Sequence, residues 1–486
     1  MVCVAGAALT GCAAVGPNFQ SPSAPAIDHY LPAPLPAETA SAPGLAGAPQ
    51  RFIGGKAVEA GWWKVFGSPT LDALEDEALK RNADLAAAQA TLRQAHELLL
   101  AQRAARLPSI QVGASAARQK NPDTLASPLS SNANVFSLYS GQFDISYVLD
   151  VFGGQRRQTE ALAAQAEFQR FQVEAAYLAV TTNVASTALQ IAGLNAQLAA
   201  SRDNVAAYTR MLEIARRMQA LGETSAADVA AAESALEQAE LAEPATRKQV
   251  GQLYDLLAVY LGRTPGEAAT PKLDLSDLQL PRDLPVSLPS DLVRQRPDVR
   301  AAEANLHAAS AQVGVAVAAR LPSFALNGSL GGVSTALGAL VSDGNTLWSF
   351  GGSAAHTLFD GGALAHQQKA AEAALDQAKE QYRAAVLAAF SNTADVLQAI
   401  VYDAETLKHT SQAADAAARS SSLAQAQFQE GETGALPALT AEATYRQAQL
   451  SLAQARTARY ADTVALMQAL GGGWSNRPKA VGDERR

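Results

Sequence analysis

Residues 168–198 read FQRFQVEAAYLAVTTNVASTALQIAGLNAQL, and this stretch decides the fold. Two series of apolar or small residues run through it in alternating steps of three and four. The first series is Phe168, Phe171, Ala175, Leu178, Thr182, Ala185, Leu189 and Ala192; the second is Val173, Tyr177, Val180, Val184, Thr187, Ile191, Leu194 and Leu198. Each series is a heptad seam, and two such seams lie on nearly opposite sides of one helix.

The positions between the seams are polar or small. The polar ones are Gln169, Gln172, Glu174, Asn183, Ser186, Gln190 and Asn195. A helix buried in a thick bundle would be apolar there. Two seams separated by two polar faces instead predict a neighbour on each side and water in front and behind, as in the wall of a hollow tube. Similar seams continue less cleanly from about Leu364 to Gln429, and a helix of about 65 residues is roughly 100 Å long.

The chain carries an internal duplication. The matches are Ala105-Arg106-Leu107-Pro108-Ser109 with Ala319-Arg320-Leu321-Pro322-Ser323, Gly153-Gly154 with Gly361-Gly362, Gly222-Glu223-Thr224 with Gly431-Glu432-Thr433, and Leu261-Gly262 with Leu470-Gly471. Their offsets are 320 − 106 = 214, 361 − 153 = 208, 431 − 222 = 209 and 470 − 261 = 209. Matches in order at nearly one offset predict two copies of one unit. The predicted segments are a signal over 1–12, a Pro/Ala-rich tether over 13–55, a first repeat over 56–263, a Pro-rich linker over 264–297, a second repeat over 298–473 and a flexible tail over 474–486.

Each copy has the same predicted order: helix, two strands, long helix, glycine turn, shorter helix. The first helix covers about 70–106, and its two strands begin at Ser109 and near Tyr139. The clearest strand alternates an apolar face (Tyr139, Gly141, Phe143, Ile145, Tyr147, Leu149) with a polar face (Ser140, Gln142, Asp144, Ser146). The strands of the second copy cover 323–330 and about 346–359.

These strands fit either a hairpin on a soluble sheet or a transmembrane sheet with alternating faces. Four strands cannot close a barrel, and open strand edges are not tolerated in lipid. If the strands cross a membrane, several chains must therefore contribute to one barrel.

Composition narrows the functional class. The net charge is −8 with acids and bases mixed along the chain, which predicts no nucleic-acid partner. Hydrophobic residues make up 48% of the chain, but alanine supplies much of this, and aromatic residues only 6%, which suits closely packed long helices. No unbroken run of 18 apolar residues occurs, so no transmembrane helix is predicted and any membrane crossing would use strands.

The two cysteines, Cys3 and Cys12, both lie in the first dozen residues, which excludes a disulfide framework or a zinc cluster. Leu9-Thr10-Gly11-Cys12 is typical of a bacterial lipoprotein signal, in which the Cys12 thiol is lipidated after export. The alternative is a small residue within an apolar signal segment. The segment before Cys12 is short and has no basic residues, so Met1 need not be the true start.

The sequence gives no support for an enzyme. It contains neither a phosphate-binding loop nor a dinucleotide fingerprint. The six histidines (29, 96, 307, 356, 366 and 409) lack metal-ligand spacing, and no serine lies in a nucleophile elbow. Glu213, Glu233 and Glu237 have the spacing of solvated helix faces rather than of a two-carboxylate site. We therefore predict no metal, and no cofactor other than the covalent lipid on Cys12.

Several phrases together resemble one protein family. They are Trp62-Trp63-Lys64-Val65-Phe66-Gly67, Arg294-Gln295-Arg296-Pro297-Asp298-Val299-Arg300-Ala301-Ala302-Glu303, Leu321-Pro322-Ser323 and Leu358-Phe359-Asp360-Gly361-Gly362. From Cys12 to about Trp474 the chain is similar to TolC-type (NodT-type) outer-membrane efflux lipoproteins, the outer-membrane factors of resistance–nodulation–division (RND) pumps. The Arg-Pro-Asp-Val-Arg phrase is the most specific of these signals.

The resemblance implies a mainly α-helical fold with a small membrane β-barrel contribution. Three chains would form a homotrimer with a twelve-strand barrel in the bacterial outer membrane and a periplasmic α-barrel of long helices. The implied partners are outer-membrane lipid, a periplasmic adaptor (membrane fusion protein) and an inner-membrane RND pump. The implied function is export of small molecules, drugs or metals, whose identity the pump chooses.

The resemblance also implies site residues. The adaptor-contacting tips would be Leu221, Gly222, Glu223, Thr224 and Ser225 in the first copy and Gly431, Glu432, Thr433 and Gly434 in the second. By position, Leu436 resembles the hydrophobic constriction residue, with Phe428 packed beside it. Thr440 stands where some members place an aspartate ring, which weakens the case for an acidic gate. Asp228 could supply acidity to the constriction instead, or simply cap the following helix.

Two other functions remain open at this point. The exit duct of a type I protein-secretion system shares the architecture, although the lipoprotein signal and the tandem tips favour small-molecule or metal efflux. A periplasmic coiled-coil scaffold lipoprotein without a pore would explain the heptads and the lipid. It would not explain the paired strands or the duplication.

Overall fold

The computed structural model describes residues 14–23, 25, 27, 29–125, 127, 129, 131–267 and 271–476. The chain divides into two compact units. The first takes residues from Met1–Pro22, Thr91–Arg170 and Ala301–Arg383, and the second from Ser23–Ala90, Phe171–Arg300 and Ala384–Arg486. Each unit therefore draws on both halves of the sequence. The predicted lipidation residue, Cys12, lies outside the described residues.

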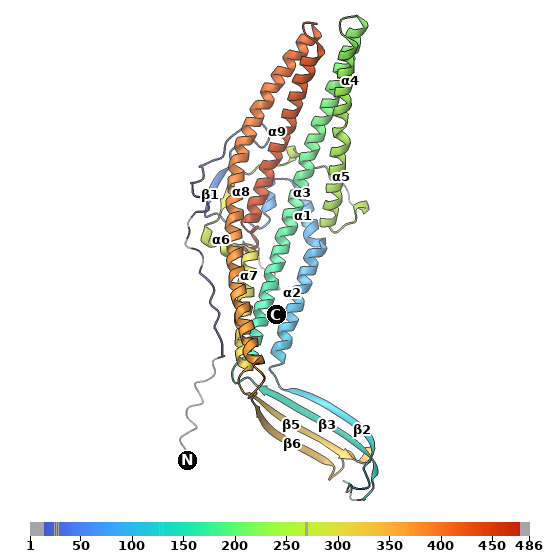
Figure 1. The fold of residues 1–486 in the computed structure, drawn as a ribbon, viewed down its shortest axis with the longest axis vertical. Helices are drawn as coiled ribbons and strands as arrows, with labels where there is room; N and C mark the ends of the chain where they lie inside the picture. Colours follow the sequence, from blue (N-terminus) through green and yellow to red (C-terminus); the bar gives the residue numbers. More distant parts are fainter. Residues whose placement is uncertain are drawn as a thin grey trace. The chain divides into compact units, whose positions relative to one another are not determined.

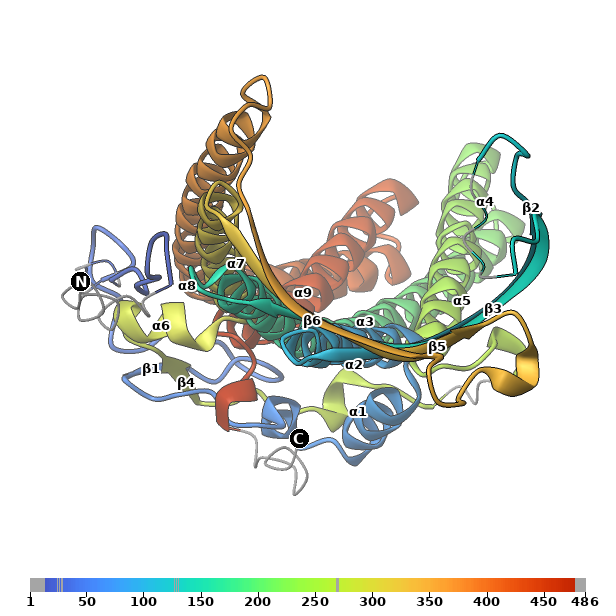
Figure 2. The ribbon, with the colours of Figure 1, turned by 90° about the horizontal axis from the view of Figure 1, so that it is seen from below.

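A four-stranded antiparallel sheet dominates the first unit. Its strands are β2 (Ser109–Lys120), β3 (Val135–Leu149), β5 (Ser323–Ser334) and β6 (Thr346–Ala355), in the order β2-β3-β5-β6. The β3–β5 pair joins the two copies of the repeat, with Phe143 opposite Leu330. The strands lie side by side as a curved sheet (Figures 1 and 2). The short η4 (Leu337–Ala339) lies in the connection between β5 and β6.

The last strand is shorter than predicted. We expected it to reach Phe359, but β6 ends at Ala355. The chain then turns through Asp360, Gly361 and Gly362, and both glycines have positive φ (66° and 91°), which the strand conformation does not allow. Leu358 and Phe359, predicted as strand residues, therefore belong to the connection and are almost fully exposed.

An aspartate starts each of the two longest helices, α3 (Gly154–Ala220) and α8 (Ala363–Gln429). Asp150 accepts hydrogen bonds from the backbone N–H groups of Gln155 and Arg156, both at 2.9 Å. Asp360 accepts equivalent bonds from Gly362 and Leu364, both at 2.8 Å. These carboxylates satisfy N–H groups that have no partner within the helix, and their charge suits the helix N-terminus. Each helix has 67 residues and is about 100 Å long.

The remaining elements lie in the second unit or cross between the units. The helices are α1 (Pro69–Arg81), α2 (Ala83–Ala104), α4 (Ala226–Glu240), α5 (Ala242–Tyr260), α6 (Pro289–Gln295), α7 (Pro297–Ala319) and α9 (Ala435–Ala469). Short 3-10 turns are η1 (Trp62–Phe66), η2 (Pro265–Glu267), η3 (Leu275–Asp277) and η5 (Trp474–Asn476). Strands β1 (Arg51–Gly54) and β4 (Asp283–Val286) pair in parallel. Trp62 and Phe66 of η1 are buried in the core of this unit.

Two helices predicted as continuous are broken. The first breaks at Asn82, whose side-chain oxygen accepts from the Leu85 N–H at 3.0 Å while its amide donates to the Tyr260 carbonyl at 3.0 Å. This residue caps α2 and ties it to the end of α5. The helix after the first glycine turn breaks at Leu241. Pro244 explains this break, because it has no N–H to donate to the Glu240 carbonyl and its ring would clash there.

Both seams of α3 are buried where the helix runs through the second unit. Ala185 and Leu189 of the first series and Val184 and Ile191 of the second are at most 1% exposed. The prediction of water on both faces is wrong near residues 180–189, because Thr181 and Ala188 are buried as well. Other segments of the same unit cover this face: the Trp63 ring of η1 lies 6.5 Å from the Tyr177 ring, centroid to centroid. Asn183 and Gln190, on the other face, are exposed.

The Pro/Ala-rich segment is packed rather than free. Thr39 and Gln50 are almost fully buried. The amide of Gln50 donates to the Thr463 hydroxyl of α9 at 3.3 Å, and buried Arg459 donates to the Ala48 carbonyl at 3.3 Å. Proline keeps such a segment extended without forming a core of its own, and here polar groups of α9 hold it in place.

Candidate functional site

The four-stranded sheet β2-β3-β5-β6 has one apolar and one polar face, as the alternation along its strands predicts. The register aligns Val112, Phe143, Leu330 and Trp348 in one row across all four strands, and these side chains are 72%, 53%, 59% and 78% exposed. On the opposite face, the Ser115 and Ser140 hydroxyls lie 2.7 Å apart and those of Ser329 and Ser349 lie 2.8 Å apart. A row of exposed large apolar residues backed by paired hydroxyls is the pattern of a lipid-facing sheet with a polar interior.

The sheet has two open edges. Among the described residues, β2 pairs only with β3 and β6 only with β5. The outer backbone N–H and C=O groups of these two strands have no ladder partner in that part of the chain, and in lipid each such group costs several kcal/mol. The sheet is therefore one segment of a barrel that other chains must complete.

The two predicted tips share one turn geometry. The Glu223 N–H donates to the Met218 carbonyl and the Glu432 N–H to the Gln427 carbonyl, both at 2.9 Å. Gly222 and Gly431 have left-handed φ values of 81° and 72°. This is the Schellman ending of a helix, which requires glycine at the left-handed position. Leu221 and Glu432 are exposed, so both tips present side chains to solvent.

Asp228 lies in a capping box at the start of α4. Its carboxylate accepts from the Ser225 hydroxyl at 2.6 Å, the Thr224 hydroxyl at 2.9 Å and the Ser225 N–H at 3.1 Å, while the Ser225 hydroxyl accepts from the Asp228 N–H. These hydrogen bonds, Ser225 first, lower the pKa of Asp228 below its ordinary value. Asp228 is therefore ionised at neutral pH while it caps the helix.

Of the other three predicted constriction residues, which lie on α8 and α9, one is buried and two are exposed. Phe428 is 2% exposed, whereas Leu436 is 66% exposed and Thr440 is also exposed. Leu436 and Thr440 lie one turn apart on α9, and the Thr440 hydroxyl donates to the Leu436 carbonyl at 2.8 Å. The two exposed residues thus share one face of the helix, away from Phe428.

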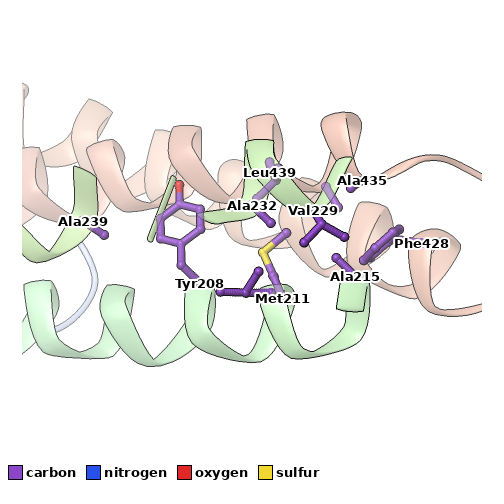
Figure 3. Packing of buried hydrophobic residues seen from close by; sticks show 11 residues of the cluster. Tyr208, Met211, Ala215, Val229, Ala232, Ala239, Phe428, Ala435 and Leu439 are labelled. Atoms are coloured by element: carbon purple, nitrogen blue, oxygen red, sulfur yellow. The ribbon is translucent and has the colours of Figure 1, made fainter. Parts of the chain in front are cut away.

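A cluster of apolar residues holds the four tip helices together. Its members come from α3 (Tyr208, Met211, Leu212, Ala215), α4 (Val229, Ala232, Ala239), α8 (Phe428) and α9 (Ala435, Ala438, Leu439). In Figure 3 the Phe428 ring lies beside Ala435, Ala215 and Val229. The small alanines let the helices approach closely, and Phe428 is the largest side chain that α8 contributes to the cluster.

Sequence reasoning missed a buried polar network next to this cluster. Glu442 of α9 is 1% exposed and accepts from the Gln425 amide at 2.8 Å, the Ser421 hydroxyl at 2.5 Å and Arg446 at 2.5 Å. A cavity of about 290 Å³ beside it is lined by residues of α3, α8 and α9, including Met211 and Phe428. The spacing of Glu442 and Arg446, four residues apart on one helix, could have suggested an ion pair but not its burial.

The described residues contain no group of three or more His, Cys, Asp or Glu side chains that could hold a metal ion. Among the described histidines, His307 meets one carboxylate and one aromatic ring rather than further metal ligands. Its ring stacks on Phe19 with a centroid separation of 4.3 Å.

One described helix, α8, contains an 18-residue window apolar enough to cross a membrane by length and composition. Our expectation of no such helix rested on unbroken apolar runs, whereas a mean hydropathy over 18 residues can be high even when polar residues interrupt the run. The helix of 67 residues is more than three times longer than the roughly 30 Å hydrocarbon core requires. A single helix that passes this test is weak evidence for a span.

An open membrane sheet, long two-seamed helices and a duplicated chain define a channel of the outer membrane, and comparison with known proteins agrees. The sequence model described as "Outer membrane efflux protein" matches residues 74–263 and 288–472. The chain therefore belongs to the outer membrane efflux protein family, which confirms the resemblance seen in the sequence.

Individual relatives match over nearly the whole chain. The outer membrane protein OprJ of Pseudomonas aeruginosa is 30% identical over 470 residues, which cover 96% of this chain and 94% of that protein. The toluene efflux pump outer membrane protein TtgF of Pseudomonas putida is 32% identical over 473 residues, covering 96% and 95%. Among solved structures, the outer-membrane channel OprN matches with a TM-score of 0.83 and 28% identity, over 95% of this chain and 99% of that one. The CmeC channel of Campylobacter jejuni shares the fold, with a TM-score of 0.86 at 22% identity over 96% of each chain.

The protein is thus the outer-membrane channel subunit of a tripartite efflux system. It is a subunit of a homotrimeric channel of the TolC type. It lies in the outer membrane, extends into the periplasm, and works with a periplasmic adaptor and an inner-membrane pump. Its known relatives are channel proteins rather than enzymes.

Proposed function

We propose that the exposed face of α9 at the second tip forms the constriction of the channel. The observation that carries this proposal is the contrast between Phe428, buried in the tip cluster, and Leu436, which is large, apolar and 66% exposed. In a trimer, three copies of Leu436 would form an apolar ring, with Thr440 as a polar ring one turn away. Hydrophobic constrictions close a pore by excluding water from it. Phe428 would set the position of the helix that carries the ring.

In this proposal Asp228 adds negative charge at the first tip but does not form a constriction ring in the trimer. Its carboxylate is committed to the capping box of α4 and stays ionised there. Negative charge at the first tip would then favour cationic over anionic molecules near the entrance. The closure itself would be hydrophobic.

The two tips would supply the adaptor-binding surface. Their exposed residues include Leu221, Glu223, Ser225 and Glu432. The charge reversal Glu432→Lys should weaken capture of the adaptor by the purified trimer. The same reversal at Glu405, an exposed residue of α8 outside the turn, should not. Equal capture by both variants would place the adaptor elsewhere.

The substrates are small molecules in this proposal, and the chain itself performs no catalysis and needs no cofactor. Several relatives are named for efflux of toluene or antibiotics, or for export of pyoverdine. The pattern Leu9-Thr10-Gly11-Cys12 supports a lipoprotein signal, and we propose that Cys12 carries the lipid anchor. Metabolic labelling with palmitate that persists in Cys12→Ser would reject this assignment.

Leu436→Ala tests the constriction. We expect higher single-channel conductance in planar bilayers and greater entry of large antibiotics into cells, because the smaller side chain widens the apolar ring and lets water in. Leu423→Ala is the matched control, since Leu423 is 67% exposed on α8 and lies outside the tip. Unchanged conductance in Leu436→Ala would move the constriction to another residue.

A further inference from the structure

The first described residues of the chain are docked onto the first unit. The Val15 N–H donates to the Phe152 carbonyl, just after β3, at 3.0 Å. The Phe19 ring stacks on the His307 ring of α7 at 4.3 Å between centroids and 12° between planes. The Ser21 hydroxyl hydrogen-bonds the Glu303 carboxylate of the same helix. We refer to residues 14–21 as the N-terminal strap.

One buried arginine holds the strap. Arg157, in the first turn of α3, is 4% exposed. Its guanidinium donates to the carbonyls of Val15 (2.9 Å), Ala14 (3.3 Å) and Gly16 (3.3 Å) and to the Asn18 side-chain oxygen (2.7 Å). The guanidinium fork thereby finds four acceptors on the strap. Among the described residues, the partner that Arg157 would keep without the strap is Glu160, with which it forms an ion pair at 2.8 Å.

Glu160 joins the arginine and the aromatic stack into one network. Its second carboxylate oxygen lies 3.0 Å from His307 Nε2, while the first pairs with Arg157. Burial tends to raise the pKa of Glu160, but the hydrogen bonds from His307 and Arg157 outweigh it and hold the pKa below the ordinary value. Glu160 thus balances the charge of Arg157, while other N–H groups of the guanidinium donate to the strap.

Glycines allow the backbone of the strap to lie very close to the backbone of its neighbours. A Cβ on Gly16 would lie 2.4 Å from the Gly314 Cα, and Gly16 has a positive φ of 89°. A Cβ on Gly314 would lie 2.8 Å from Arg157 Cγ and 2.9 Å from the Val15 carbonyl oxygen. A Cβ on Gly153 would lie 2.5 Å from that of Ala14. Glycines on both sides therefore let the strap reach the arginine.

We propose that Arg157 is a positioning residue that fixes where the lipid anchor enters the membrane. This inference rests on the lipid proposed for Cys12. Only two residues separate Cys12 from Val15, so the backbone of Cys12 lies at most about 11 Å from Val15 at roughly 3.6 Å per residue. The acyl chains then enter the bilayer beside the end of β3 instead of at the end of a long free tether. Arg157 makes four of the hydrogen bonds that hold the strap, and with it the anchor, beside this strand.

The test uses the full trimer, labelled in cells with palmitate and reconstituted into vesicles. Chymotrypsin cleaves after phenylalanine, and in the docked strap the half-buried Phe19 ring is held against His307 and must leave it to enter the protease. We expect Arg157→Ala to speed cleavage after Phe19 at least about tenfold, the factor that about 1.4 kcal/mol of lost docking would give. The cut would remove the label from the channel polypeptide while the strands keep the channel in the vesicle. The peptide ending at Phe19 is quantified by mass spectrometry.

Matched variants distinguish loss of the Arg157–strap hydrogen bonds from a general destabilisation of the protein. Arg170→Ala removes a half-exposed arginine further along α3 and should leave cleavage slow. Arg157→Lys keeps the charge but not the planar fork, so it should resemble Arg157→Ala rather than the wild type. Gly314→Ala keeps the arginine but puts a Cβ 2.8 Å from Arg157 Cγ and 2.9 Å from the Val15 carbonyl oxygen, so it should displace the strap and also speed cleavage. Gly251→Ala, where an added Cβ meets nothing within 4 Å, should not.

Light scattering must show trimers for every variant that is compared. If Arg157→Ala and Gly314→Ala are cleaved after Phe19 no faster than their two controls, the proposal that Arg157 holds the strap is wrong. Absence of palmitate from the wild-type protein would instead remove the lipid, and with it the anchor-positioning role. The rate of cleavage would still decide whether Arg157 holds the strap.

Discussion

The two helical tips share the turn Gly-Glu-Thr and its backbone but differ in the residues that follow it. In the first, the Ser225–Asp228 capping box closes the start of α4, and the Thr224 hydroxyl joins it. With the offset of 209 the counterparts in the second tip are Gly434 (434 − 225 = 209) and Pro437 (437 − 228 = 209), neither of which can form such a box. The counterpart of Thr224 is Thr433, whose buried hydroxyl oxygen has no hydrogen-bond partner among the described residues. The first tip is held by polar caps, the second by Phe428 and its neighbours.

A second contrast concerns one interhelical link found in both copies. In the first copy, Arg216 of α3 pairs with Glu233 of α4 at 2.7 Å on the surface, with side chains 59% and 47% exposed. The counterparts are Gln425 and Glu442 (425 − 216 = 209 and 442 − 233 = 209), and here the carboxylate is buried. The duplication kept the link between the paired helices and changed its environment. An exposed ion pair adds little to the free energy of unfolding. Removing one partner of a buried, hydrogen-bonded carboxylate lowers that free energy strongly, because the other groups are left buried and unpaired.

Phe428→Ala should give the largest difference between the tips. Removing a buried phenylalanine costs about 3–5 kcal/mol, so the amides in the first turns of α9 should lose most of their protection from hydrogen exchange. Gln219→Ala, the exposed counterpart in the first copy (428 − 219 = 209), should leave the first turns of α4 unchanged. Similar loss at both tips would mean that the tip cluster does not distinguish them.

Glu442→Ala should come next. It removes the acceptor shared by Ser421, Gln425 and Arg446, at a cost of about 3 kcal/mol. Glu233→Ala should cost less than about 1 kcal/mol, because its ion pair is exposed. Hydrogen exchange across the α8–α9 pair and the α3–α4 pair, measured in detergent trimers, gives both values. A loss at Glu233 as large as that at Glu442 would show that burial does not set the strength of this link.

Lowering the pH should reduce the hydrogen-exchange protection of the first tip more than that of the second. We expect this change to be smaller than those predicted for Phe428→Ala and Glu442→Ala. The folded-state pKa of Asp228 is below its ordinary 3.8. Its capping contribution is therefore complete well above pH 3.8 and is lost as the pH falls through the lower folded-state value. Exchange rates of the first α4 amides, corrected for intrinsic pH dependence, should rise as the pH is lowered below 3.8. Asp228→Asn should abolish this rise, and its persistence there would assign the effect to another group.

Much of the architecture could be predicted from local patterns. The period of two located β3, and the repeated glycines located both tips, because strand alternation and left-handed turns are properties of a few adjacent residues. The predictions failed where distant segments intervene. The break at Asn82 depends on the Tyr260 carbonyl, and the dry second face of α3 depends on Trp63 and its neighbours. Pro244 marks a break that the sequence did contain and that a stricter use of proline would have found.

The candidate site was only partly accessible to the sequence. The tip residues and Leu436 came from the family resemblance, and their roles stay predictions. Glu442 and Arg157 were missed, because neither lies in a motif and each matters through burial. Glu233 and Glu442 have the same spacing from their partners, yet one faces water and the other a cavity beside α3.

The sequence by itself determined the duplication, the alternating strands, the long two-seamed helices and the family. Each of these follows from periods of 2 and 3.5 residues or from short ordered phrases, which exist along the chain before it folds. Only the tertiary structure decided which link between paired helices is buried, where the strap docks and how its arginine is satisfied. Burial and hydrogen-bond partners depend on residues more than a hundred positions apart, such as Arg157 and Val15, and no local pattern carries that information.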